Sequence, residues 1–235
     1  MRAQVSRVTT QAQQHRILSR LDLVPDWGEI LRYLGYPRDA APAPDVAGLI
    51  ERLLPECFAC LDSRGTYAVH DVTDAVADSL TVGEVVIEGG VSDFLGTVDR
   101  VAAFVVSVGA EITARSERAC RDGDAFAGWV FDAVGSWAVE SATDALMQQL
   151  RSTLAEGLGL TLRYSPGYCG MDLSQQQAIF RLISAEAVGV TLLPSMMMSP
   201  TKSISGVVGI GEESELDLQA SPCDRCPELG CHMRR

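Results

Sequence analysis

The sequence predicts an α+β fold with a largely antiparallel sheet and long flanking helices, and three observations lead to this class. Apolar residues at helical spacing mark long segments, the longest of them over residues 124–156. Short runs rich in β-branched residues, separated by Gly and Asp, mark strands between residues 65 and 108. Helices and strands come in blocks, without the regular strand–helix alternation of a doubly wound parallel sheet.

The N-terminal part of the chain is expected to be helical. Residues 1–25 are polar and rich in Gln; they indicate one short helix, and we treat them as an N-terminal extension. An amphipathic helix over residues 27–36 stops at a Gly-Tyr-Pro sequence. Proline residues in segment 37–44 predict a linker. Residues 45–60 predict a second amphipathic helix, with Asp45 as its N-cap.

Strands and two further helices follow. The strands are expected at residues 66–69, 79–82, 84–87 and 102–108, with a helical turn around residues 93–98. The helices are expected at residues 110–121 and 124–156. The second helix carries a long apolar stripe that includes Trp129 and Trp137, and Gly157 is expected to end it.

The C-terminal half continues this block pattern. Residues 160–163 predict a strand that leads into a Pro-Gly turn. Residues 174–177 have the form of a capping box, with Ser174 as the N-cap of a helix. Short strands are expected at residues 190–193, 195–198 and 203–210.

The composition argues against several classes of function. A net charge of −12 and a pI near 4.6 argue against nucleic acid or an anionic membrane as the main partner. No window approaches the roughly 18 uninterrupted apolar residues of a membrane span. The N-terminus has no apolar core of the signal-peptide type. We therefore expect a soluble, cytoplasmic protein.

The segment from Arg163 to Tyr168 is the leading candidate for a ligand site. The pair Pro166-Gly167 signals a turn, because Pro sets φ at the first central position and Gly accepts a positive φ at the second. An Arg and a Tyr brought together at such a turn can hold a carboxylate and cover a flat ring. An ordinary turn with a solvated Arg163 is the competing interpretation.

Glu140 is a second candidate, because it lies three residues after Trp137 at the edge of the apolar stripe. It is either a solvated carboxylate on the flank of the helix or a carboxylate that faces a pocket. Gly135 and Ser136 in the middle of the same helix leave room for the close approach of another element.

Two motifs in this half of the chain carry a resemblance. Arg163, Pro166, Gly167 and Tyr168 form an Arg-x-x-Pro-Gly-Tyr turn. A later segment reads Ser-x-x-Met-x-Pro-x-x-Ser-x-Ser-Gly, with its fixed positions at Ser195, Met198, Pro200, Ser203, Ser205 and Gly206. Together these motifs resemble the activation (reactivation) domain of cobalamin-dependent methionine synthase, and the similarity is clearest over residues 125–210.

The resemblance implies a module that binds S-adenosylmethionine and supports reductive remethylation of a corrinoid. His15, His70 and His232 do not sit in the family's Asp-x-His-x-x-Gly pattern that supplies the lower cobalt ligand, and the chain has no room for a corrinoid module. We therefore expect a separate partner, a corrinoid methyltransferase or methionine synthase core, to carry the cobalamin. A reductant of the flavodoxin or ferredoxin type would supply the electron. Because the chemistry would occur at the partner's cobalt, we expect no catalytic residue in this chain.

The same resemblance implies a set of cofactor-binding residues. They are Arg163, Ser165, Pro166, Gly167, Tyr168, Glu140, Met198, Lys202, Ser203 and Ser205. This sequence departs from the family pattern at Lys202, where the family has a small residue. The family's tyrosine-rich stretch after the Ser-Gly segment is also missing here.

The last segment, residues 212–235, joins an acidic connector to a Cys-rich tail. The spacing Cys-x2-Cys-x4-Cys of Cys223, Cys226 and Cys231 is compact enough for a metal site, and His232 or Cys169 could supply a fourth ligand. Zinc fits this pattern, and so does an iron–sulfur cluster, which would suit electron delivery to a corrinoid. A reduced tail without metal is the alternative.

Elsewhere, Cys57 and Cys60 have the spacing of a redox motif but end an amphipathic helix, so we interpret them as core thiols.

We therefore expect a main domain over residues 26–211 that acts as an S-adenosylmethionine-binding reactivation module. One alternative is a metal or iron–sulfur accessory protein that passes an electron to a corrinoid protein. Another is a ligand-binding module without a corrinoid partner.

Overall fold

The computed structural model describes residues 14–37, 40–168, 170–216 and 230. At its centre lies a five-stranded sheet in which every neighbouring pair of strands is antiparallel. In spatial order the strands are β1 (Gln14–Ser19), β2 (Arg64–Asp71), β6 (Arg100–Ser107), β10 (Ser203–Glu212) and β7 (Leu158–Leu160). The predicted α+β class with a largely antiparallel sheet is confirmed.

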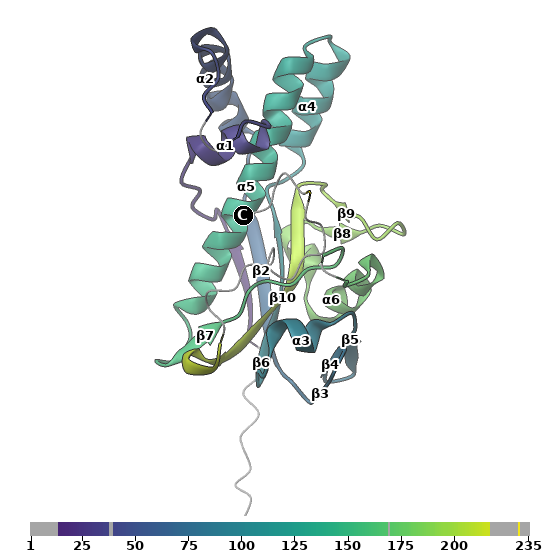
Figure 1. Ribbon diagram of the computed structural model, residues 1–235. Coiled ribbons are helices and arrows are strands. Elements are labelled where there is room, and N and C mark those ends of the chain that lie inside the picture. The colour runs from purple at the N-terminus through teal and green to yellow at the C-terminus, as the bar shows by residue number, and fades with distance from the viewer. Residues whose placement is uncertain (1–13, 38–39, 169, 217–229, 231–235) are drawn as a thin grey trace, which may run out of the picture.

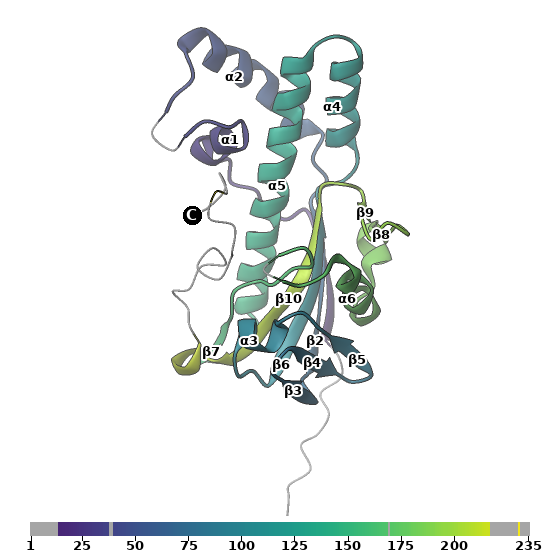
Figure 2. The same cartoon turned by 45° about the vertical axis from the view of Figure 1, so that its right-hand side comes forward.

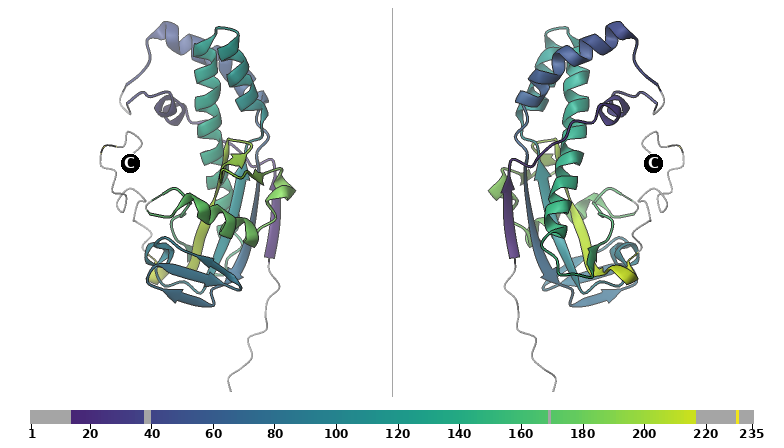
Figure 3. Two further views of the ribbon diagram at one scale, coloured as in Figure 1. Left: turned by 90° about the vertical axis from the view of Figure 1, so that its right-hand side faces the viewer. Right: turned by 90° about the vertical axis from the view of Figure 1, so that its left-hand side faces the viewer.

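One long helix, α5 (Ala125–Arg151), lies on one face of this sheet, and three further helices pack against α5. They are α1 (Trp27–Tyr33), α2 (Pro44–Ala59) and α4 (Glu111–Arg121). In Figure 1, α4 leads away from the sheet and α5 returns along it, while α1 and α2 gather around the first half of α5. The second half of α5 covers the sheet, as the two side views of Figure 3 show.

Smaller elements cover the other face. A second sheet consists of β3 (Asp74–Val76), β4 (Ser79–Val82) and β5 (Val85–Ile87), and it is followed by α3 (Val91–Leu95). Later in the chain come α6 (Gln176–Leu182) and a hairpin of β8 (Thr191–Leu192) and β9 (Met198–Ser199). Short 3-10 helices span Leu173–Gln175, Ala185–Val188 and Glu213–Glu215. Figure 2 shows α6 across the sheet from α5.

The central strand β6 is buried on both faces because both layers pack against it. Phe104 and Val106 point into the core beneath the helices, whereas Ala103 and Val105 point into the core beneath α6. This is the period of two that an extended strand imposes. The strand therefore reads as a nearly continuous apolar run in the sequence, although it belongs to an antiparallel sheet.

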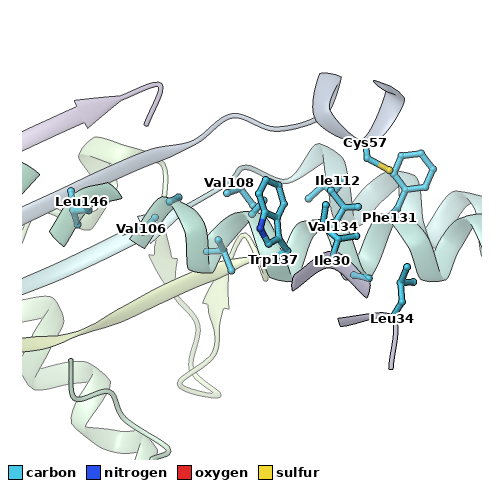
Figure 4. Packing of buried hydrophobic residues seen from close by; sticks show 14 of the residues in the cluster. Ile30, Leu34, Cys57, Val106, Val108, Ile112, Phe131, Val134, Trp137 and Leu146 are labelled. Atoms are coloured by element: carbon cyan, nitrogen blue, oxygen red, sulfur yellow. The ribbon is translucent and has the colours of Figure 1, made fainter. Parts of the chain in front are cut away.

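The helical core gathers around Trp137 in the middle of α5 (Figure 4). The indole is 3% exposed and meets the ring of Phe58 edge-on, with centroids 6.0 Å apart. Further along, Cys57 lies beside Phe131. The burial of these large apolar side chains holds α5 against the sheet.

The segment expected to hold a short N-terminal helix forms a strand instead, in the part that the structure describes. Gln14–Ser19 is β1, and it pairs antiparallel with β2 from Gln14 opposite Val69 to Ser19 opposite Arg64. For the described residues 14–25 the helix prediction was wrong, because the edge of β2 supplies backbone hydrogen bonds that a local sequence pattern does not reveal.

Two predicted N-caps were also wrong. Helix α2 begins at Pro44 without a side-chain cap, and Asp45 lies in its first turn. Near the predicted capping box, the carboxylate of Asp172 accepts from the backbone N–H of Ser174 at 2.8 Å. Helix α6 starts only at Gln176, with Gln175 at its N-cap position and no side-chain cap, so Ser174 does not cap it.

Three further details also differ from the predictions. Helix α5 ends at Arg151, so Gly157 does not terminate it. Trp129, placed on the buried stripe by its spacing, is 48% exposed. In the predicted strand 195–198, Met196 has a φ of 65° and lies in the hairpin turn before β9. Within the described ranges, no helix is long and apolar enough to cross a membrane.

Candidate functional site

The predicted Pro-Gly turn is confirmed. The backbone N–H of Tyr168 donates to the carbonyl of Ser165 at 3.2 Å, and Gly167 has a φ of 91°. A Pro at the first central position and a positive φ at the second are the marks of a type II turn. The N–H of Gly167 also donates to the carbonyl of Met171 at 2.8 Å, which closes the loop on its far side.

Tyr164 anchors this turn to the sheet. Its side chain is 2% exposed and stacks on Phe94 of α3 with centroids 4.2 Å apart. Its hydroxyl donates to the carbonyl of Gly89 at 2.6 Å, and its backbone exchanges two 2.9 Å hydrogen bonds with Val207 of β10. Successive side chains of an extended segment alternate between faces, so Arg163 lies on the face that α5 covers.

Gly206 is where the two sequence motifs meet. A Cβ at this position would lie 2.6 Å from the carbonyl oxygen of Tyr164 and 2.7 Å from Oγ of Ser165. Any larger residue would therefore push the turn away from β10. The segments 163–168 and 195–206, separate in the sequence, therefore meet at Gly206 in the fold.

Arg163 lies against α5 between two carboxylates that are one helical turn apart. Its Nη2 is 3.2 Å from Oε2 of Glu140 and 3.2 Å from Oδ1 of Asp144. The side chains of Arg163 and Glu140 are 27% and 33% exposed, and that of Asp144 is 61% exposed. Nη1 is buried and has no hydrogen-bond partner among the described residues. A buried donor without an acceptor is costly, so an anionic group placed there would be stabilised.

Lys202 reaches the same helix two turns earlier. Its Nζ lies 2.7 Å from Oδ1 of Asp132 and donates to Oγ of Ser136 at 2.8 Å. The Lys202 side chain is 13% exposed, and its Cε lies 3.3 Å from where a Cβ of Gly135 would stand. The predicted close approach at Gly135 and Ser136 is therefore confirmed. Lys202 joins the start of β10 to the middle of α5.

These contacts define a polar row along α5. Its members, spaced by four residues, are Asp132, Ser136, Glu140 and Asp144. Residues four apart lie above one another on a helix and are about 6 Å apart along its axis. The row meets two cations, Lys202 at one end and Arg163 at the other.

The remaining predicted site residues lie close to these elements but differ in exposure. Ser205 is 2% exposed, and its hydroxyl donates to Oε1 of Gln176 at 2.6 Å. The hydroxyl of Ser203 donates to the carbonyl of Pro200 at 2.7 Å. Met198 is half-buried against the core beneath α6. The ring of Tyr168, in contrast, is 61% exposed.

The sequence that forms this candidate site matches a known protein family. A protein-family model described as the activation domain of vitamin B12 dependent methionine synthase matches residues 88–216, more than half of the 235 residues. The chain belongs to this family. The match includes the Pro-Gly-Tyr turn, all of α5 and all of β10, which are the elements that form the candidate site.

The activation-domain fold is also seen in a solved structure. The chain resembles the crystal structure of the MetH reactivation domain bound to AdoHcy, with a TM-score of 0.66 and 17% sequence identity. The alignment covers 88% of this chain and 80% of that chain. At this level of identity the likeness concerns the fold. A search of curated proteins found no match.

Sequence reasoning missed two residues of this activation-domain site. Asp144 was not predicted, although its position four residues after Glu140 on a helix was a signal that could have found it. Tyr164 was not predicted either, because its role depends on Phe94 and Gly89, which are distant in the sequence.

The predicted metal site cannot be placed, because its residues lie outside the described residues. They are Cys223, Cys226 and Cys231, with Cys169 and His232 as candidate fourth ligands. In the part of the chain that the structure describes, no group of three or more His, Cys, Asp or Glu side chains could hold a metal ion.

Proposed function

We propose that this chain binds S-adenosylmethionine, or a closely related adenosyl amino acid, as a reactivation module. The observation that carries the proposal is the buried, unpartnered Nη1 of Arg163 beside the carboxylates of Glu140 and Asp144. An α-carboxylate matches the guanidinium, and an α-ammonium matches the carboxylates. The relative of the same fold was crystallised with AdoHcy, which has this headgroup.

The other predicted residues divide into two roles in this proposal. Tyr168 is exposed next to the turn and would cover the flat ring of the adenine. Lys202 and Met198 would shape the adjoining surface. Ser205 is buried, and its hydroxyl is already hydrogen-bonded to Gln176. We therefore assign Ser205, together with Ser203, a supporting role in holding β10 and the turn in place.

We further propose that the module acts on a corrinoid carried by a methyltransferase of the methionine synthase type. Membership in the activation-domain family supports this partner class. The chain would position the methyl donor, while the corrinoid on the partner would supply the chemistry when a reductant delivers an electron. The alternative of an iron–sulfur accessory protein depends on cysteines outside the described residues, and no described contact favours it.

Calorimetric titration of anaerobically purified protein with S-adenosylmethionine tests the binding proposal. We expect saturable binding, and we expect Arg163→Ala to weaken it by about 30- to 150-fold, because a hydrogen-bonded charge pair contributes about 2–3 kcal/mol. Arg151→Ala is the matched control. Arg151 also lies on the α5 face of the fold and pairs with Glu213, but at the far end of the helix, so its loss should leave the affinity unchanged.

The absence of binding by the wild-type protein would overturn this proposal. Equal affinities for the wild-type protein and Arg163→Ala would show instead that the ligand binds elsewhere on the chain.

A further inference from the structure

Asp144 is a residue of the candidate site to which neither the sequence motifs nor the family match assigns a role. Its Oδ1 is as close to Nη2 of Arg163 as Oε2 of Glu140 is, at 3.2 Å in each pair. The two carboxylates are four residues apart on α5 and therefore stand one above the other. Asp144 thus belongs to the same charge cluster as Glu140.

This cluster carries an uncompensated negative charge. Glu140 and Asp144 bring two carboxylates, and Arg163 is the cation that contacts both of them. The side chain of Asp144 is 61% exposed, so solvent weakens its field, but a unit charge a few ångströms away still acts on a group bound nearby. Both ion pairs use Nη2, whereas Nη1 is buried without a hydrogen-bond partner among the described residues, so it is the donor that we assign to a ligand carboxylate.

The neighbouring cluster on α5 shows what a balanced arrangement looks like. Asp132 lies 2.7 Å from Nζ of Lys202, one carboxylate against one cation. Its side chain is 56% exposed, close to the 61% of Asp144. The two aspartates therefore differ in charge balance far more than in exposure.

The net charge of the ligand determines which adenosyl compound the excess negative charge of this cluster stabilises. S-adenosylmethionine carries a carboxylate, an ammonium and a sulfonium, so its net charge is positive. S-adenosylhomocysteine has a neutral thioether in place of the sulfonium and carries no net charge. Opposite charges attract, so the cluster with Asp144 present favours the sulfonium compound.

We propose that Asp144 is a specificity-determining residue that gives the site its preference for the sulfonium ligand over the thioether. This inference rests on the proposed function, because it assumes that the headgroup binds at Arg163. Glu140 and Arg163 hold the headgroup common to both ligands. Asp144 supplies the additional negative charge that distinguishes them.

The test is a pair of calorimetric titrations, with S-adenosylmethionine and with S-adenosylhomocysteine, on the wild-type protein and on Asp144→Asn. We expect the wild-type protein to prefer S-adenosylmethionine. In Asp144→Asn we expect the ratio of the two affinities to fall by about threefold to tenfold, the size of one unit charge a few ångströms away in a largely aqueous setting. High salt should reduce the wild-type preference in the same direction.

Two further variants sharpen the test. Asp144→Glu keeps the negative charge, so it should keep the preference for S-adenosylmethionine. If Asp144 had only a structural role, restoring the charge in this way would not restore the ratio of the two affinities. Glu213→Gln removes a carboxylate that is balanced by one cation, Arg151, at the far end of α5, and it should leave the ratio unchanged.

The outcomes separate this inference from the proposed function. If both ligands bind and the ratio is the same in the wild-type protein and Asp144→Asn, the role of Asp144 is refuted while ligand binding stands. If the wild-type protein binds neither ligand, the proposed function is wrong and this inference falls with it.

Discussion

Gly206 determines how closely the Pro-Gly-Tyr turn approaches β10. The contacts that a Cβ would make there are with the backbone oxygen of Tyr164 and with Oγ of Ser165, and the backbone oxygen cannot rotate away. Arg163 precedes Tyr164 directly, so a shift of the turn also shifts the guanidinium relative to Glu140. Gly206 thereby determines where the Arg163 side chain lies relative to α5.

We expect Gly206→Ala to lower the free energy of unfolding by about 1–3 kcal/mol, the usual cost of overpacking. The same substitution should weaken ligand binding because the turn moves. Gly211→Ala is the control on the same strand, since a Cβ there would meet its nearest neighbour, Cδ2 of Leu216, at 3.4 Å. Urea denaturation measures the free energies of unfolding. Equal free energies for Gly206→Ala and Gly211→Ala would show that a Cβ at position 206 does not clash with Tyr164 and Ser165.

At the scale of elements, α5 has two functions along its length. Its apolar side is buried against α1, α2, α4 and the sheet, and Leu146 and Leu150 lie in that core. Its polar row faces Lys202 and Arg163. Since one rigid helix carries both, the packing of its core side fixes where the carboxylates stand.

Trp137→Ala tests how much of this positioning depends on the core of α5. Trp137 is 3% exposed, so we expect its truncation to lower the free energy of unfolding by about 3–5 kcal/mol, through lost burial and the cavity left behind. Trp129→Ala on the same helix should cost far less, because Trp129 is 48% exposed. Thermal or urea denaturation compares the two, and similar losses would mean that the assigned burial is wrong.

At the scale of the whole molecule, the sheet separates two cores, and the candidate site uses both. Tyr164 is anchored in the core beneath α6, whereas Arg163 reaches the helical layer on the opposite face. The candidate site therefore depends on the packing of both faces of the sheet. Neither core by itself would bring the turn and α5 together.

The stability of the whole fold at alkaline pH should report on the buried thiol of Cys57. Burial raises the pKa of this thiol from its ordinary value of 9.0 to about 12, and the neighbouring Cys60 adds to the shift. The unfolded chain then loses this proton at a lower pH than the folded protein does. The stabilisation from Cys57 is complete below about pH 9 and is lost as the pH rises toward 12.

We therefore expect the free energy of unfolding of the wild-type protein to fall more steeply above pH 9 than that of Cys57→Ala, by up to about 1.4 kcal/mol per pH unit. Cys120→Ala is the control, because Cys120 is exposed and its removal should leave the slope unchanged. Urea denaturation at several alkaline pH values measures the slopes. Equal slopes of the free energy of unfolding against pH for the wild-type protein and Cys57→Ala would contradict the raised pKa of Cys57.

Much of the fold was predictable from the sequence where a long pattern repeats. Helix α5 and strand β6 were found because many buried residues recur at the period of their element. Strand β1 was missed because its hydrogen bonds come from β2, and Trp129 was placed in the core because spacing alone does not say where a packed stripe ends.

The fold class, the Pro-Gly turn and the resemblance to the activation-domain family could be predicted from the sequence, because they depend on local patterns and on spacing along the chain. The tertiary structure alone decided that Asp144 joins Glu140 at Arg163, that Tyr164 anchors the turn and that Lys202 pairs with Asp132. These contacts join segments far apart in the chain, and their existence depends on how two cores pack against one sheet. Local periodicity holds no information about such distances, so only the folded molecule reveals them.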